Sequence, residues 1–132
     1  MIGGLIDVSA TRMQALLPTT GPAAMALAAR NYGTDVALEE GGLRWSYLEL
    51  ETEVRRAAAA FIAAGLRHGD RVAIWAPNTG RWIVAALGAQ SVGGIVVPLN
   101  TRLKGREASY ILNRSGARIL VHVGEGDDAT AI

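Results

Sequence analysis

The chain has 132 residues, of which 50% are hydrophobic and 19% are charged, and its formal net charge is +1. This balance suits one small domain or part of a larger one. It excludes a disordered, acidic or strongly basic chain, so nothing indicates nucleic-acid binding. The chain contains no cysteine, which excludes disulfides, thiol chemistry and cysteine-based metal sites.

The first 17 residues show no basic segment ahead of an apolar core, so no signal peptide is expected. The longest apolar candidate for a membrane span, residues 83–99, is interrupted by glycines and polar residues. It falls short of the ~18 residues that a span requires. We therefore expect a cytoplasmic α/β protein without a membrane span.

The first half of the chain predicts two helices and a hairpin. One helix begins at Pro22, which suits the first helical position, and ends at Gly33. Residues 36–45 predict a hairpin that turns at two glycines. Ser46 and Glu49 then fit a capping box, in which each side chain accepts a hydrogen bond from the other residue's amide. Apolar residues at helical spacing follow this box and predict a long helix.

The second half alternates strands and helices. Strands are expected over 71–76, 95–97 and 118–123, with helices over 80–92 and 105–115 between them. Short apolar strands that alternate with helices predict a parallel sheet with right-handed crossovers. The predicted fold class is α/β: part of a doubly wound, mostly parallel sheet with flanking helices, plus a small N-terminal hairpin.

Polar turns follow the first two strands of this predicted sheet, at 76–79 and 98–102. In an open α/β sheet the ligand crevice lies beyond the carboxyl ends of the strands, so these turns should open on one rim. A purely structural role stays open for both. Asn78 or Thr79 can cap the next helix, and the side chain of Asn100 can close an Asx-turn.

The polar tail, residues 124–132, is expected to be disordered or truncated. Its Gly-x-Gly-x-x-Ala pattern is typical of dinucleotide sites. Too few residues follow for the helix that would meet the pyrophosphate, and the carboxylates within the pattern would repel it. His68 and His122 lie far apart in the sequence. No catalytic or metal-binding residue is therefore assigned.

Short motifs occur in a fixed order along residues 36–121. They are Trp-Ser-Tyr-x-Glu-Leu at 45–50, Gly-Leu-x-x-Gly-Asp-Arg-Val-Ala at 65–73, Pro-Asn at 77–78, and Gly-Gly-Ile-Val-Val-Pro-Leu-Asn-x-Arg at 93–102. Their order and spacing resemble the N-terminal region of the adenylate-forming (AMP-binding) acyl-CoA synthetases, with a lean toward fatty-acid and steroid-acid CoA ligases. The resemblance implies that the whole chain is a partial N-terminal domain of that fold.

The resemblance implies a two-step ligase reaction. A carboxylic acid and ATP give an acyl-adenylate and pyrophosphate, and CoA then displaces AMP. ATP, CoA and Mg are the implied cofactors, and the acid is not specified. The family's phosphate loop, rich in Ser, Thr and Gly and ending in Pro-Lys, does not occur in these 132 residues. We therefore expect that the isolated chain does not form acyl-adenylate.

One pair of binding residues follows from the resemblance. In some CoA ligases the arginine after the Pro-Leu-Asn turn approaches the phosphates of the CoA nucleotide, and here that position is Arg102, with Lys104 nearby. Arginine suits this task because its planar, permanently charged fork can donate two hydrogen bonds to one phosphate. The alternative, that both residues lie in a solvated loop, stays open. Trp75 and Trp82 are interpreted as packing residues.

A second class of function also stays open, a non-catalytic α/β binding module for a protein or nucleotide partner. A part of a larger enzyme should expose an apolar face and a bare sheet edge, and should self-associate through them. A free-standing module should be monomeric and polar on its exposed helix faces. The nearly apolar helix at 80–92 favours part of an enzyme.

Overall fold

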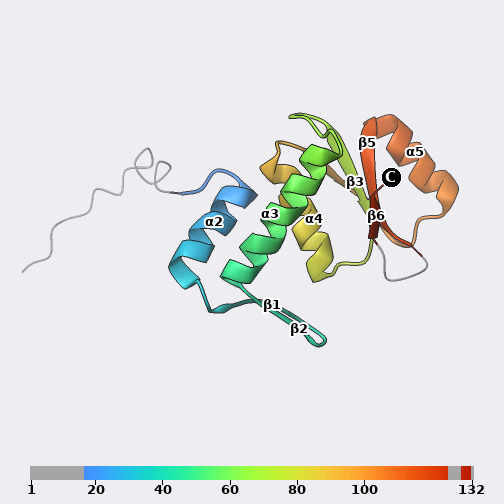
Figure 1. Cartoon of the computed structure of the whole chain (residues 1–132). Helices are drawn as coiled ribbons and strands as arrows, with labels where there is room; N and C mark the ends of the chain where they lie inside the picture. The colour runs from blue at the N-terminus through green and yellow to red at the C-terminus, as the bar shows by residue number, and fades with distance from the viewer. Residues whose placement is uncertain (1–16, 125–128, 132) are drawn as a thin grey trace, which may run out of the picture.

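The computed structural model describes residues 17–124 and 129–131 (Figure 1). Within these residues the predicted helices and strands are confirmed, with bounds within one residue of those expected. In chain order the elements are α2 (Gly21–Tyr32), β1 (Val36–Glu40), β2 (Leu43–Ser46), α3 (Tyr47–Ala63), β3 (Arg71–Trp75), α4 (Gly80–Ser91), β4 (Ile95–Pro98), α5 (Gly105–Ser115), β5 (Ala117–Val123) and β6 (Ala129–Ala131).

The main sheet has the strand order β4-β3-β5-β6. Strand β3 is parallel to both of its neighbours, β4 and β5, as the alternation of strands and helices predicts. Its residues Val72, Ala73 and Ile74 are each 0% exposed. A parallel strand with helices on both faces is apolar in every residue, which explains this uninterrupted run.

Helices cover the two faces of the sheet in an unequal way. Helices α3 and α4 pack on the face that carries Val72 and Ile74. Helix α5 packs through Ala108 on the opposite face, which carries Ala73. Figure 1 shows α3 and α4 together beside β3, and α5 on the far side of β5. The resulting three-layer arrangement confirms the α/β fold class.

Helices α3 and α4 approach each other closely at Gly88. A Cβ atom on this glycine would lie 2.6 Å from the Cβ of Ala57 and 3.1 Å from the backbone nitrogen of Ala58. Only a residue without a side chain fits at this crossing. On the other side of the pair, α2 packs against α3 and α4 through a second apolar cluster that includes Met25, Ala29 and Leu50.

The hairpin of β1 and β2 leads directly into α3. Both hydrogen bonds of the predicted capping box are present. The Oγ of Ser46 accepts from the amide of Glu49 at 3.2 Å, and a carboxylate oxygen of Glu49 accepts from the amide of Ser46 at 2.8 Å. The hydrogen bond from the Ser46 backbone, and then that from its side chain, lower the pKa of Glu49 below its ordinary value.

The C-terminal strand β6 is an element not expected from the sequence. Ala129–Ala131, within the tail expected to be disordered or truncated, pair antiparallel with the end of β5. The strand is short and two of its three residues are alanine, which is depleted in strands, so the sequence does not predict it. Residues 125–128 and 132, which carry most of the Gly-x-Gly-x-x-Ala pattern, lie outside the described residues.

Candidate functional site

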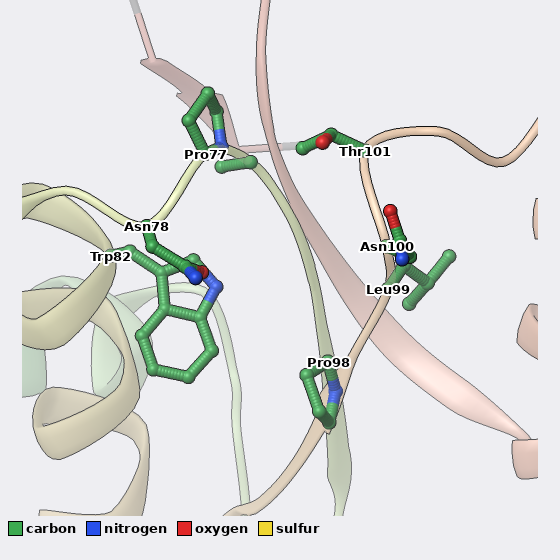
Figure 2. Close-up of a pocket in the computed structure, with 8 residues that line it drawn as sticks. Pro77, Asn78, Trp82, Pro98, Leu99, Asn100 and Thr101 are labelled. Atoms are coloured by element: carbon green, nitrogen blue, oxygen red, sulfur yellow. The ribbon is translucent and has the colours of Figure 1, made fainter.

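The turns that follow β3 and β4 line one pocket of about 380 Å³. Figure 2 shows Pro77, Asn78 and Trp82 on one wall and residues 98–101 on the other. The prediction that both turns open on one rim is confirmed. Ligand pockets in proteins span roughly 300 to 1,000 Å³, so this pocket has room for part of a small molecule.

The turn after β3 is fixed by caps at the start of α4. The Oγ1 of Thr79 accepts from the amide of Trp82 at 3.3 Å, so Thr79 is the residue that caps the helix. A carboxylate oxygen of Glu40, from the hairpin, accepts from the amide of Gly80 at 2.6 Å. Asn78 does not cap α4 and instead lies on the pocket wall.

The turn after β4 is fixed by Asn100. Its side-chain oxygen accepts from the amide of Arg102 at 2.9 Å, which is the Asx-turn foreseen from the sequence. Its backbone carbonyl accepts from the indole N–H of Trp75 at 3.1 Å and from the amide of Leu103 at 3.1 Å. The contact with Trp75 joins the ends of two neighbouring strands.

Arg102 and Lys104 lie beside this pocket without lining it. Both side chains are exposed, and neither forms an ion pair with another described residue. The amide of Lys104 donates to a carboxylate oxygen of Glu107 at 2.9 Å. A side-chain anion thus already lies at the start of α5, so the helix end itself offers little to an incoming phosphate.

The two histidines lie in different parts of the fold and have different neighbours. His68 is exposed, and its ring covers Gly93, where a Cβ would lie 2.4 Å from the ring carbon Cδ2. His122 is half-buried in β5, opposite Trp75 of β3. Among the described residues, no group of three or more histidine or carboxylate side chains is placed to hold a metal ion.

An apolar groove of about 1,010 Å³ runs between the hairpin, α3, α4 and β5. Trp45, Phe61, Trp82, Ile119 and Val121 are among the residues that line it. Trp82 therefore borders both the groove and the strand-end pocket, and it packs against the apolar core as expected. The groove lies on the face of β5 opposite to α5.

Sequence reasoning missed two contacts of this region. The hydrogen bond of Trp75 to Asn100 joins residues 25 apart, and that of Glu40 to Gly80 joins residues 40 apart. Neither pair lies within a motif of fixed spacing, so no signal in one sequence reveals them. Separately, no helix in the described part of the chain is long and apolar enough to cross a bilayer.

A mostly parallel sheet with helices on both faces and a pocket beyond its carboxyl ends defines a doubly wound α/β protein. The family model described as "AMP-binding enzyme" matches residues 25–131. The chain therefore belongs to the AMP-binding enzyme family.

Two curated relatives are CoA ligases. The chain is 44% identical over 107 residues to the 3-[(3aS,4S,7aS)-7a-methyl-1,5-dioxo-octahydro-1H-inden-4-yl]propanoyl:CoA ligase of Rhodococcus jostii, a match that covers 81% of this chain and 21% of that ligase. It is 41% identical over 95 residues to the crotonobetaine/carnitine–CoA ligase of Escherichia coli, covering 68% of this chain and 18% of that enzyme. The chain thus spans about a fifth of the length of these relatives.

Two solved structures of other proteins have the same fold. A fatty acyl CoA synthetase of Mycobacterium tuberculosis superposes with a TM-score of 0.72 at 31% identity, over 74% of this chain and 20% of that one. The N-terminal subdomain of Klebsiella oxytoca NpsA, in complex with 3-hydroxyanthranilyl-AMSN, superposes with a TM-score of 0.75 at 25% identity, over 80% of this chain and 27% of that one. The expected N-terminal subdomain architecture is confirmed.

Proposed function

We propose that this chain supplies the first subdomain of an ATP-dependent acyl-CoA ligase, which converts a carboxylic acid, ATP and CoA to acyl-CoA, AMP and pyrophosphate. The family and the CoA-ligase names of its relatives support the reaction class. The observation that carries the proposal is the strand-end pocket, which is bordered by the segment with the exposed cations Arg102 and Lys104. We further propose that the enzyme acts in the cytoplasm.

In this proposal the chain binds the CoA nucleotide. CoA supplies the thiol that displaces AMP, and its phosphates are held by Arg102 and Lys104. Both groups fit that role because they are exposed and form no ion pair among the described residues. The Asx-turn at Asn100 fixes the backbone from which Arg102 extends. A phosphate bound there would accept charge-assisted hydrogen bonds.

The described residues do not fit Mg or the ATP triphosphate in the same way. No cluster of metal ligands occurs among them, and the 132 residues contain no Ser/Thr/Gly-rich loop ending in Pro-Lys. We therefore assign no step on ATP to this chain and propose that it is inactive by itself. Exchange of labelled pyrophosphate into ATP by the purified chain, dependent on a carboxylic acid, would contradict this.

The apolar groove supports a packing role. Its wall includes Phe61, Ile119 and Val121, and the hydrophobic effect favours covering such a surface. We propose that the groove packs against the portions that the relatives carry beyond the matched fifth of their length. In their absence it should drive self-association of the isolated chain.

A chimera tests the ligase role. Residues 25–131 would replace the matched segment of the Rhodococcus jostii ligase, to which they are 44% identical. We expect the chimera to form acyl-CoA from the acid of the parent enzyme, because the matched segment is taken to be scaffold and CoA entrance. A folded chimera without activity would favour the alternative, a non-catalytic binding module.

Variants of the chimera test the phosphate contact. Arg102→Gln and Lys104→Gln should each raise the KM for CoA by roughly tenfold to 150-fold while leaving the KM for ATP unchanged, since a charged hydrogen bond contributes about 1.5–3 kcal/mol. Arg114→Gln, a matched control in the last turn of the helix α5 that follows these residues, should change neither constant. If all three variants have the same KM for CoA as the unmodified chimera, Arg102 and Lys104 do not contact the CoA phosphates.

A further inference from the structure

The backbone around Arg102 is held by hydrogen bonds that converge on one residue, Asn100. The carbonyl oxygen of Asn100 accepts from the indole N–H of Trp75 and from the amide of Leu103, each at 3.1 Å. Its side-chain oxygen accepts from the amide of Arg102 at 2.9 Å. Asn100 itself is exposed, so it has little packing of its own to fix its position.

Trp75 can fix the position of Asn100 because Trp75 itself belongs to the packed part of the fold. It is the last residue of β3, the central strand, and it is half-buried against the apolar cluster of Ala73, Leu99 and Ala108. The packing of the ring holds the indole N–H in place and directs it to the neighbouring turn. A hydrogen bond from a group that is already immobilised costs little further entropy.

The same turn has a second attachment to β3. The amide of Leu99 donates to the carbonyl of Ile74 at 2.9 Å, and Leu99 is 4% exposed. This backbone bond fixes the start of the turn, whereas the bond from Trp75 fixes it one residue further on, next to the Asx-turn. Loss of the indole N–H would therefore detach the backbone of residues 100–102 from β3, while the start of the turn stays bonded to Ile74 through Leu99.

We infer that Trp75 is a positioning residue for the anion contact of this pocket. Its indole N–H orients Asn100, and Asn100 in turn sets the direction in which Arg102 leaves the backbone. Trp75 does not touch the phosphate and acts only through Arg102. The inference rests on the proposed function, since it needs Arg102 to contact the phosphates of CoA.

The test removes the N–H and keeps the ring. Trp75→Phe is made in the full chain, and a second variant carries β-(3-benzothienyl)alanine at position 75, which has the shape of tryptophan but lacks the N–H. Trp45→Phe, in the hairpin and away from the lining of the pocket, is the matched control. CoA binding is followed by NMR titration, and amide hydrogen exchange is measured at Arg102 and Leu103.

We expect both Trp75 variants to bind CoA roughly threefold to tenfold more weakly, the range set by the net contribution of one hydrogen bond. Amide exchange at Arg102 and Leu103 should rise in both, and not in Trp45→Phe. In an Arg102→Gln background, Trp75→Phe should weaken CoA binding no further, because residues that act through one contact are not additive.

The outcomes separate the inference from the proposed function. If Arg102→Gln weakens CoA binding but the benzothienyl variant binds like the parent chain, or if the two losses add, Trp75 has no positioning role. Unchanged exchange at Arg102 in the benzothienyl variant overturns the inference as well. If Arg102→Gln leaves CoA binding intact, or the parent chain does not bind CoA, the proposed phosphate contact fails, and the inference falls with it.

Discussion

The crossing of α3 and α4 at Gly88 gives the sharpest prediction about stability. Replacing Gly88 with alanine would place a Cβ 2.6 Å from the Cβ of Ala57 and 3.1–3.2 Å from backbone atoms of Ala57 and Ala58. Backbone atoms cannot rotate away, so the two helices have to separate. Because α3 and α4 together form the layer over β3, the strain reaches the centre of the fold.

Two opposing terms set the size of the effect. Overpacking of a well-packed interface costs about 1–3 kcal/mol. Alanine gains about 1 kcal/mol over glycine within a helix, because glycine loses more backbone entropy on folding. The net result for Gly88→Ala is a loss of about 0–2 kcal/mol in the free energy of unfolding. Without the clash the same change would stabilise the chain.

The chain offers a matched control in Gly105. This glycine begins α5, and an added Cβ would meet nothing within 4 Å. Gly105→Ala should therefore be neutral or stabilising by about 0.4–1 kcal/mol. Urea unfolding, followed by circular dichroism, compares the two variants with the parent chain. If Gly88→Ala proves more stable than the parent chain, the close approach of α3 and α4 is refuted.

Three further predictions concern the hairpin, the capping box and the groove. Glu40→Gln should lower the free energy of unfolding by about 0.5–1.5 kcal/mol and speed amide exchange at Gly80, because it weakens a charge-assisted hydrogen bond. The same change at its neighbour in β1, Glu39→Gln, is the control, and equal effects of the two variants would contradict the prediction. The lowered pKa of Glu49 means that its carboxylate stabilises the fold above the pKa of the unfolded chain, and that this contribution is lost as pH falls through the lower, folded pKa. Glu49→Gln should therefore be less stable than the parent at neutral pH and converge with it as pH falls through the lowered pKa of Glu49 in urea titrations, whereas a constant gap would show that the charge is irrelevant. Val123→Glu, on the groove, should reduce self-association in sedimentation experiments. Ile62→Glu is the control and should not, because Ile62 lies outside the groove although it is as exposed as Val123, at 62% against 61%.

Local signals in the sequence were sufficient for most of the fold. The apolar run of β3 predicts a strand covered on both faces, and Val72, Ala73 and Ile74 are indeed fully buried. The Ser46–Glu49 capping box and the Asx-turn at Asn100 also form as expected, since each joins residues only two or three apart. Interactions of this kind depend on local backbone geometry, which a few neighbouring residues determine.

The candidate site could be predicted only in part, because part of it is made by contacts between distant segments. The strand-end rule places both turns on one rim, and they do line one pocket. The same rule does not show that Glu40 reaches the start of α4 or that Trp75 reaches Asn100. Nor does it show strand β6, whose pairing with β5 depends on backbone groups that have no signature in the side chains.

The groove follows from the unequal way in which the helices cover the sheet. Helices α3 and α4 cover the central strand β3, and α5 covers the opposite face of the sheet. The α3–α4 face of β5 keeps Ile119 and Val121 on the wall of an open groove. A parallel strand is stable when both of its faces are covered, so this face of β5 favours a partner surface. A chain that presents a polar pocket at its strand ends and an apolar groove beside them is suited to complete a site whose other half packs into that groove.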